Sequence, residues 1–263
     1  MKSSQTSQLY PSDLSNGAWE IIQKLIPVNY GPGRPIELDM RQVVNAIFYV
    51  VRTGCQWRAL PREYPKWSSI YYHFRKWCKT GIWQRINTAL RKLDRKRRGR
   101  KEDPSAGVMD TQSVKTTEAG GERGYDAAKK VNGRKRHIVV DTPGNLLDVV
   151  VHAADIQDRD GAKLVLHKLV ETVSSLEKIW ADGIYKGGLI EWVRETLGIV
   201  LEIVKRDPDQ VGFKVLPRRW VVERTFAWLG RYRRLSKDYE RLIECSEGMV
   251  YAASIGTMLK RIA

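Results

Sequence analysis

The sequence predicts an α/β protein in which a mixed sheet flanked by helices follows a small all-helical N-terminal domain. Three observations predict this class. Apolar residues recur at helical spacing through roughly the first ninety residues, β-rich runs alternate with helical ones from about residue 108, and a basic segment separates the two parts. In that segment, residues 91–101, eight of eleven residues are Lys or Arg. Such a composition cannot bury a core, so we expect an exposed hinge or frayed helix end between domains at residues 12–95 and 104–263.

The N-terminal part carries start and stop signals for consecutive helices. Ser15 can cap a first helix that ends at Pro27, and Asp39 can cap a second whose apolar stripe runs to Gly54. A third helix is expected from Ser68 or Ser69, and a fourth from residue 82 into the basic segment.

Basic residues on the third predicted helix permit a DNA-reading role. Arg75, Lys76 and Lys79 lie on it, and a short connection joins it to its neighbour, as in a helix-turn-helix. The alternative is a small helical bundle whose basic face is only solvated.

The second part changes to a β period. Residues 108–116 form a predicted strand, and two further β-rich runs flank Thr142-Pro143-Gly144-Asn145. Pro followed by Gly at the centre of a turn is typical of type II, so we expect a hairpin. The elements that follow are a helix over 158–173, a strand over 176–181, a helix over 189–197, a strand over 200–204 and helix from 218. This order is the ribonuclease H-like arrangement.

Charge indicates the class of partner. The chain has a formal net charge of +16 and a pI near 9.8. Such a field favours a polyanion, because each neutralised phosphate releases a condensed counterion. Nucleic acid fits better than a membrane surface, since no basic amphipathic helix stands apart from the globular pattern. The alternative is a basic protein whose charge only keeps it in solution.

The cysteines and the N-terminus indicate the compartment. Cys55, Cys78 and Cys245 show neither CxxC pairing nor zinc-type spacing with histidine. No apolar run approaches the roughly twenty residues that span a bilayer, and the N-terminus has no signal-peptide core. We expect a protein that stays inside the cell, in a reducing cytosol.

Three acids have positions that suit metal-dependent phosphodiester chemistry. Asp110 interrupts an apolar strand, where a carboxylate is costly unless it is paired or bound to metal. Asp182 ends a short strand, where ligands of α/β sheets gather. Glu223 is the one acid among seven basic residues between Arg218 and Lys237. Each also has an ordinary interpretation: an edge-strand acid, a turn acid, and half of a surface Arg–Glu pair.

Other acids compete for the same role. Asp141 and Asp148 flank the predicted hairpin turn and are expected to be turn or surface residues. Asp155 could support a site without binding metal, and Asp158 and Asp160 begin the helix after the hairpin. From the residues alone, the choice of three remains open.

Several motifs occur in a fixed order along nearly the whole chain. They are GRP at 33–35, RTGCQWR at 52–58, MDTQSVK at 109–115, GRKRH at 133–137, ADGIYKG at 181–187 and RWVVERTFAWL at 219–229. Together they resemble the DDE transposases of bacterial insertion sequences, in the group called insertion sequence family five. The chain departs from that group's wider Tyr-Arg-Glu-Lys pattern, with Leu216 at the Tyr position and Gly230 at the Lys position.

The resemblance implies a site and a reaction. Asp110, Asp182 and Glu223 would bind two Mg²⁺ ions, with Mn²⁺ as a substitute, and Asp110 would bridge them. Arg219 would contact a phosphate near the scissile bond, and Tyr185 would pack on the DNA end. The implied reaction is cleavage at the element's terminal inverted repeats, followed by strand transfer into target DNA.

The implied partners are double-stranded DNA and further copies of the chain, as a homodimer or larger assembly. Two alternatives are a ribonuclease H-like nuclease that cuts without joining and a non-catalytic DNA-binding regulator. The basic residues expected to contact DNA, besides Arg219, Arg75 and Lys76, are Arg224, Arg231, Lys135, Arg136, Arg95, Lys96, Arg97 and Arg98.

Overall fold

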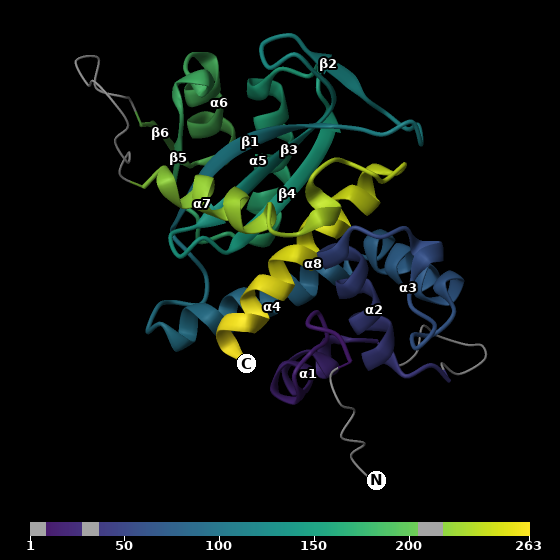
Figure 1. Cartoon of the computed structure of the whole chain (residues 1–263). Helices are drawn as coiled ribbons and strands as arrows, with labels where there is room; N and C mark the ends of the chain where they lie inside the picture. Colours follow the sequence, from purple (N-terminus) through teal and green to yellow (C-terminus); the bar gives the residue numbers. More distant parts are fainter. Residues whose placement is uncertain (1–8, 28–36, 205–217) are drawn as a thin grey trace.

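The computed structural model describes residues 9–27, 37–204 and 218–263, and it places a curled sheet beside a group of helices (Figure 1). The motif at 33–35 and Leu216 lie outside the described residues. The α-helices are α1 (Asn16–Ile22), α2 (Met40–Thr53), α3 (Trp67–Lys79), α4 (Ile82–Arg97), α5 (Asp158–Thr172), α6 (Gly188–Leu197), α7 (Trp220–Leu229) and α8 (Ile243–Ile262). The strands are β1 (Ala106–Lys115), β2 (Gly124–Asp126), β3 (Val131–Asp141), β4 (Leu146–Ala153), β5 (Lys178–Ala181) and β6 (Val200–Ile203).

Local sequence signals explain the helix ends. The Ser15 hydroxyl accepts a hydrogen bond from the Ala18 amide, and the Asp39 carboxylate accepts one from the Arg41 amide, as helix caps do. Gly54 ends α2 with a φ of 75°, a left-handed conformation that glycine adopts without steric cost. The third helix begins slightly before the predicted serines, at Trp67.

The sheet is mixed, as predicted. β3 pairs antiparallel with β1, β2 and β4, while β1, β5 and β6 run parallel to one another. The predicted hairpin joins β3 to β4, but its turn is not the expected type II turn centred on Pro143 and Gly144. The Gly144 amide donates to the Asp141 carbonyl at 2.9 Å, so Thr142 and Pro143 are the central residues and Gly144 follows them with a φ of 93°. Helices α5 and α6 cover one face, and α7, α4 and α8 lie on the other. This arrangement confirms the ribonuclease H-like fold class.

The C-terminal helix α8 links the two parts of the molecule. It packs against α2, α3 and α4 and also against β4 (Figure 1). One apolar core therefore joins Trp77 and Trp83 of the N-terminal helices to Met249 and Ile255 of α8. No described helix is long and apolar enough to cross a membrane.

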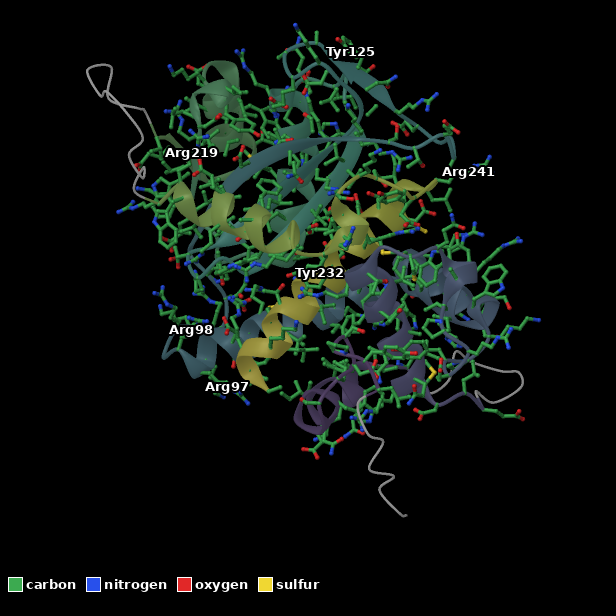
Figure 2. The ribbon with its side chains drawn as sticks, in the orientation of Figure 1. Arg97, Arg98, Tyr125, Arg219, Tyr232 and Arg241 are labelled. Atoms are coloured by element: carbon green, nitrogen blue, oxygen red, sulfur yellow. The ribbon has the colours of Figure 1, made fainter. Side chains whose placement is uncertain are left out.

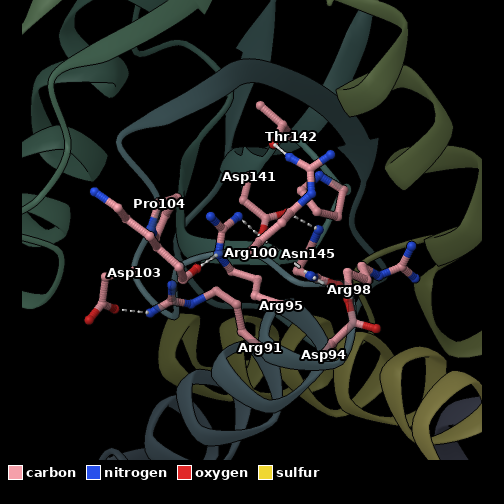
Figure 3. A network of polar contacts seen from close by, with 12 residues as sticks. Arg91, Asp94, Arg95, Arg98, Arg100, Asp103, Pro104, Asp141, Thr142 and Asn145 are labelled. Carbon is pink, nitrogen blue, oxygen red and sulfur yellow. Dashed lines mark hydrogen bonds and ion pairs between the residues drawn. The ribbon is translucent and has the colours of Figure 1, made fainter.

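The basic segment is not the exposed hinge that its composition predicts. Helix α4 continues to Arg97, and Arg91 and Arg95 are only 1% and 5% exposed. Arg95 forms a 3.0 Å ion pair with Asp141, and Arg91 pairs with Asp103 at 3.2 Å (Figure 3). The prediction is therefore wrong for Arg91 and Arg95, because acids elsewhere in the chain neutralise them and allow them to be buried. Residues 96–101, where α4 ends, are exposed, as expected of a helix end.

Asp141 and Asp148 are likewise buried rather than on the surface. Asp141 does hold the turn, since it accepts a hydrogen bond from the Asn145 amide, but its side chain is enclosed. Asp148 accepts hydrogen bonds from Gln84 and Tyr251 and pairs with Lys168 at 3.0 Å. Both carboxylates thus form hydrogen bonds and ion pairs that hold the hairpin against the surrounding helices.

Candidate active site

Asp110 and Asp182 are neighbours because β1 and β5 are adjacent parallel strands. The register pairs Val108 with Trp180, so Asp110 and Asp182, each two residues further on, reach the same end and face of the sheet. Asp182 also caps the turn Gly183–Tyr185, where its carboxylate accepts a hydrogen bond from the Ile184 amide at 2.9 Å. That hydrogen bond fixes the Asp182 side chain at the carboxyl end of β5.

Glu223 comes from the first turn of α7, which packs against β1. Its side chain is 49% exposed. The Arg219 guanidinium, one turn earlier, lies 3.5 Å from Glu223 and 3.6 Å from Asp182. The three acids predicted from sequence therefore gather at one place, two of them linked by a shared cation.

The Asp110 carboxyl has an altered acidity. Burial and, to a smaller extent, the negative charge of Asp182 raise its pKa to about 6, against a hydrogen bond from the Thr111 amide and the charge of Arg219, which act in the opposite direction. Burial and a like charge both disfavour the ionised form. The site therefore holds more negative charge than its own cation compensates.

The donor set fits a hard divalent cation. All three side chains offer carboxylate oxygens, the ligands that Mg²⁺ prefers, and the uncompensated charge at Asp110 favours a cation there. Within residues 9–27, 37–204 and 218–263, no group of three or more Asp, Glu, His or Cys side chains is arranged so that it could hold a metal ion. Arg219 is the cation that now lies between Asp182 and Glu223.

Tyr185 lies inside the fold rather than on a surface where DNA could pack. Its ring is 1% exposed, and its hydroxyl is 2.7 Å from Nε2 of His137. Nδ1–H of His152 donates to the Ala153 carbonyl, so Nε2 of neutral His152 is free to accept a hydrogen bond from Nδ1–H of His137. The other ring nitrogen of His137, Nε2, then accepts a hydrogen bond from the Tyr185 hydroxyl. The chain of hydrogen bonds anchors the turn after Asp182 to β3.

Three predicted DNA-binding cations are also buried. Lys135 pairs with Asp158 at 3.0 Å, Arg136 donates to the Leu235 carbonyl at 2.7 Å, and Arg95 is held by Asp141. These contacts lie inside the protein and leave no surface for a phosphate. The sequence missed this outcome because the partners are backbone carbonyls and acids far away in the chain.

The remaining predicted basic residues keep positions where DNA could reach them. Arg97 and Arg98 lie at the end of α4, at the lower left of Figure 2, where Arg97 donates to the Ile262 carbonyl and Arg98 pairs with Asp94. Among the other basic residues predicted to contact DNA, Lys96, Arg231 and Arg75 are exposed. Lys76 is partly exposed and donates to the Tyr72 hydroxyl.

Beside Arg219 and Glu223, helix α7 carries a row of two tryptophans with an arginine between them. The Arg224 guanidinium stacks between two indole rings, 4.3 Å from Trp220 and 4.5 Å from Trp228. Arg261 of α8, which sequence reasoning missed, lies 5.2 Å from the Trp228 ring. The spacing i, i+4, i+8 of the two tryptophans around Arg224 was the available signal for this row.

Comparisons with known proteins identify the family of the chain. Residues 101–253, more than half of the chain, match a family described as a transposase DDE domain. Residues 14–87 match a family described as proposed transposases of the IS4/5 family. An uncharacterized 16.2 kDa protein of insertion element IS402 from Burkholderia cepacia is 29% identical over 109 residues, which cover 39% of this chain and 72% of that protein. The chain thus belongs to the DDE-domain transposases of the IS4/5 group.

Proposed function

We propose that this transposase binds the terminal inverted repeats of a bacterial insertion sequence, cuts DNA at the element ends and joins them to target DNA with the help of divalent metal ions. The observation that supports the proposal is that the Arg219 guanidinium contacts both Asp182, at the end of β5, and Glu223 of α7, while Asp110 lies beside Asp182 on the adjacent strand β1. These residues are separated widely in sequence, and their convergence at one end of a sheet favours a reacting centre.

Each residue has a distinct part in this proposal. Asp110, Asp182 and Glu223 would hold two divalent ions, Mg²⁺ with Mn²⁺ as substitute, with Asp110 shared between them. When bound, such ions stabilise the attacking and the leaving oxygen of an in-line displacement. Arg219 would turn from the carboxylates to a phosphate oxygen, since its forked donors suit both partners.

The two steps balance without a covalent protein–DNA bond. Water attacks the phosphorus at the element end, the P–O3′ bond breaks, and the products are a 3′-hydroxyl and a 5′-phosphate. The freed 3′-hydroxyl then attacks a phosphorus of target DNA and displaces the 3′-oxygen of the target strand. Two element ends must be held together in this second step, so we propose at least a homodimer in the active assembly.

DNA backbone contacts would extend along α7. Arg224, stacked between Trp220 and Trp228, and Arg98 at the end of α4 lie near the β3–β4 turn. The charges of Arg261 and Arg98 contribute to the lowered pKa of Arg224, after burial, so the arginines repel one another. A phosphate at this surface would relieve that repulsion.

The test compares cleavage of a duplex carrying an element end by the unchanged chain and by Asp110→Asn in Mg²⁺. We expect a rate at least a thousandfold lower for the variant, equivalent to roughly 4 kcal/mol of barrier. Asp160→Asn is the matched control, because that side chain is 63% exposed on α5. Near-normal cleavage by Asp110→Asn would contradict the assignment.

A second assay separates the alternatives. Pre-cut ends with a free 3′-hydroxyl are mixed with target DNA, and joined products are measured. Cleavage without joining would indicate a nuclease. Binding that persists in EDTA, with no cleavage in Mg²⁺ or Mn²⁺, would indicate a DNA-binding regulator.

A further inference from the structure

A cavity of about 480 Å³ opens on the side of the molecule away from the three carboxylates. Arg241, which lines it, and Arg219 lie at opposite sides of Figure 2. The volume falls within the roughly 300–1,000 Å³ of pockets that hold small ligands. Its walls come from the segment after α2, from the start of α3 and from the segment before α8.

The lining is mainly aromatic. Four half-buried rings take part, those of Trp57, Trp67, Tyr71 and Tyr239. Trp57 meets Tyr71 edge to face, with ring centroids 5.3 Å apart.

The charge at the cavity is positive. Glu240 is neutralised by Arg234, whose guanidinium lies 2.7 Å from the carboxylate. Arg58 and Arg241 are both exposed, and the Arg58 guanidinium lies 5.0 Å from the Trp67 ring centroid. An anionic group would thus meet two cations at the edge of an aromatic pocket.

The wall formed by Tyr239 and Arg241 is held firmly in place. Buried Arg134 of β3 donates to the Glu240 carbonyl at 2.7 Å and to the Arg241 carbonyl at 2.9 Å. Its guanidinium also pairs with Asp238 at 3.1 Å. The pocket is therefore anchored to the sheet on one side and to the N-terminal helices on the other, and it does not have to be assembled when a ligand arrives.

We infer that this pocket binds an unpaired DNA base, with Arg58 and Arg241 contacting its flanking phosphates. Aromatic rings stack on a base whatever its sequence, and arginines bind the backbone. This inference rests on the proposed function only in taking DNA as the ligand, because the site is separate from the carboxylates.

The test measures binding of a ten-nucleotide oligothymidylate and of a duplex of equal length to the full chain, in EDTA and at high ionic strength, where contacts to phosphate alone weaken. Because stacking on an aromatic ring contributes to the binding of each base, we expect Trp67→Leu to weaken oligothymidylate binding about tenfold. Duplex binding should change less than twofold. Arg58→Gln, an exposed substitution with little risk to folding, should act in the same direction.

Trp192→Leu is the matched control, since Trp192 is a partly exposed tryptophan on α6. Unchanged oligothymidylate affinity in both pocket variants, or an equal loss for the duplex, would overturn the inference. Tighter binding of an acidic peptide than of the oligonucleotide would overturn it as well. Asp110→Asn should bind the oligonucleotide normally, so failure of the pocket and failure of the cleavage site give different results.

Discussion

The Arg219 guanidinium lies between the carboxylates of Asp182 and Glu223, 3.6 Å from one and 3.5 Å from the other. It shares both acids with any metal ion that binds there. Arg219→Gln should therefore bind Mn²⁺ more tightly, because a competing cation is gone. It should cleave DNA at least tenfold more slowly, because a phosphate contact is lost.

Calorimetry with Mn²⁺ and a cleavage assay check the two effects separately. Arg219→Lys, which keeps the charge without the planar fork, should fall between the unchanged chain and Arg219→Gln. Weaker Mn²⁺ binding by Arg219→Gln would contradict a purely competitive relationship between arginine and metal.

The buried pair of Arg95 and Asp141 predicts a large stability effect in a segment whose composition suggested an exposed linker. Asp141→Ala leaves an uncompensated buried cation and should lower the free energy of unfolding by about 3–5 kcal/mol. The double variant Arg95→Met/Asp141→Leu should recover much of that loss. Urea denaturation measures both.

Lys96→Ala is the control, since Lys96 is exposed and 4.0 Å from Glu102. It should change stability by less than about 0.5 kcal/mol. A comparable loss in Lys96→Ala and Asp141→Ala would show that burial of the pair has no special effect.

The buried histidines predict a loss of stability in acid. Burial lowers the pKa of His137 well below its usual value, with His152 contributing, and burial lowers that of His152 as well. Below about pH 6.5 these histidines therefore bind protons in the unfolded chain but remain neutral in the folded chain. Stability should be full above about pH 6.5, the unfolded value, and should decrease as the pH falls from there toward the folded pKa.

Thermal melting at pH 7.5 and 5.5 tests this in the Asp110→Asn background, where titration of Asp110 makes no contribution. His152→Gln should show a smaller decrease in melting temperature than its parent. His167→Gln is the control, because His167 is exposed on α5. An equal decrease in all three chains would contradict this origin of acid sensitivity.

Arginines near the β3–β4 turn should contribute to the salt dependence of DNA binding. Each phosphate contact adds about one unit to the slope of log affinity against log salt concentration. Arg98→Gln and Arg224→Gln should each reduce the slope by about that amount. Arg194→Gln, exposed on α6, should leave it unchanged. Filter binding over a salt series decides the outcome.

Sequence reasoning reached the parts of the fold that depend on neighbours along the chain. Ser15 and Asp39 begin helices and Gly54 ends one, each through contacts within four residues. The positive φ of Gly144 in the hairpin is likewise a local property of the backbone. Asp110 and Asp182 were singled out by their strand positions and by the resemblance, but their closeness rests on the parallel pairing of β1 with β5, which only the structure shows.

What sequence reasoning could not reach depends on partners far away in the chain. Arg136 is buried because it donates a hydrogen bond to the Leu235 carbonyl, and Arg134 is buried because it forms an ion pair with Asp238. A basic side chain is exposed or buried according to such partners, which composition does not reveal. The packing of helix α8 against the N-terminal helices could not be predicted either, because its apolar residues do not reveal which distant helices they contact.

The central claim, that Asp110, Asp182 and Glu223 together bind divalent metal, is tested most directly by anomalous diffraction from crystals grown with Mn²⁺. We predict a peak within coordination distance of Asp110 and of at least one of Asp182 and Glu223, and its loss in Asp110→Asn. A strong peak at other residues, or none at saturating Mn²⁺ with a DNA end bound, would contradict the account.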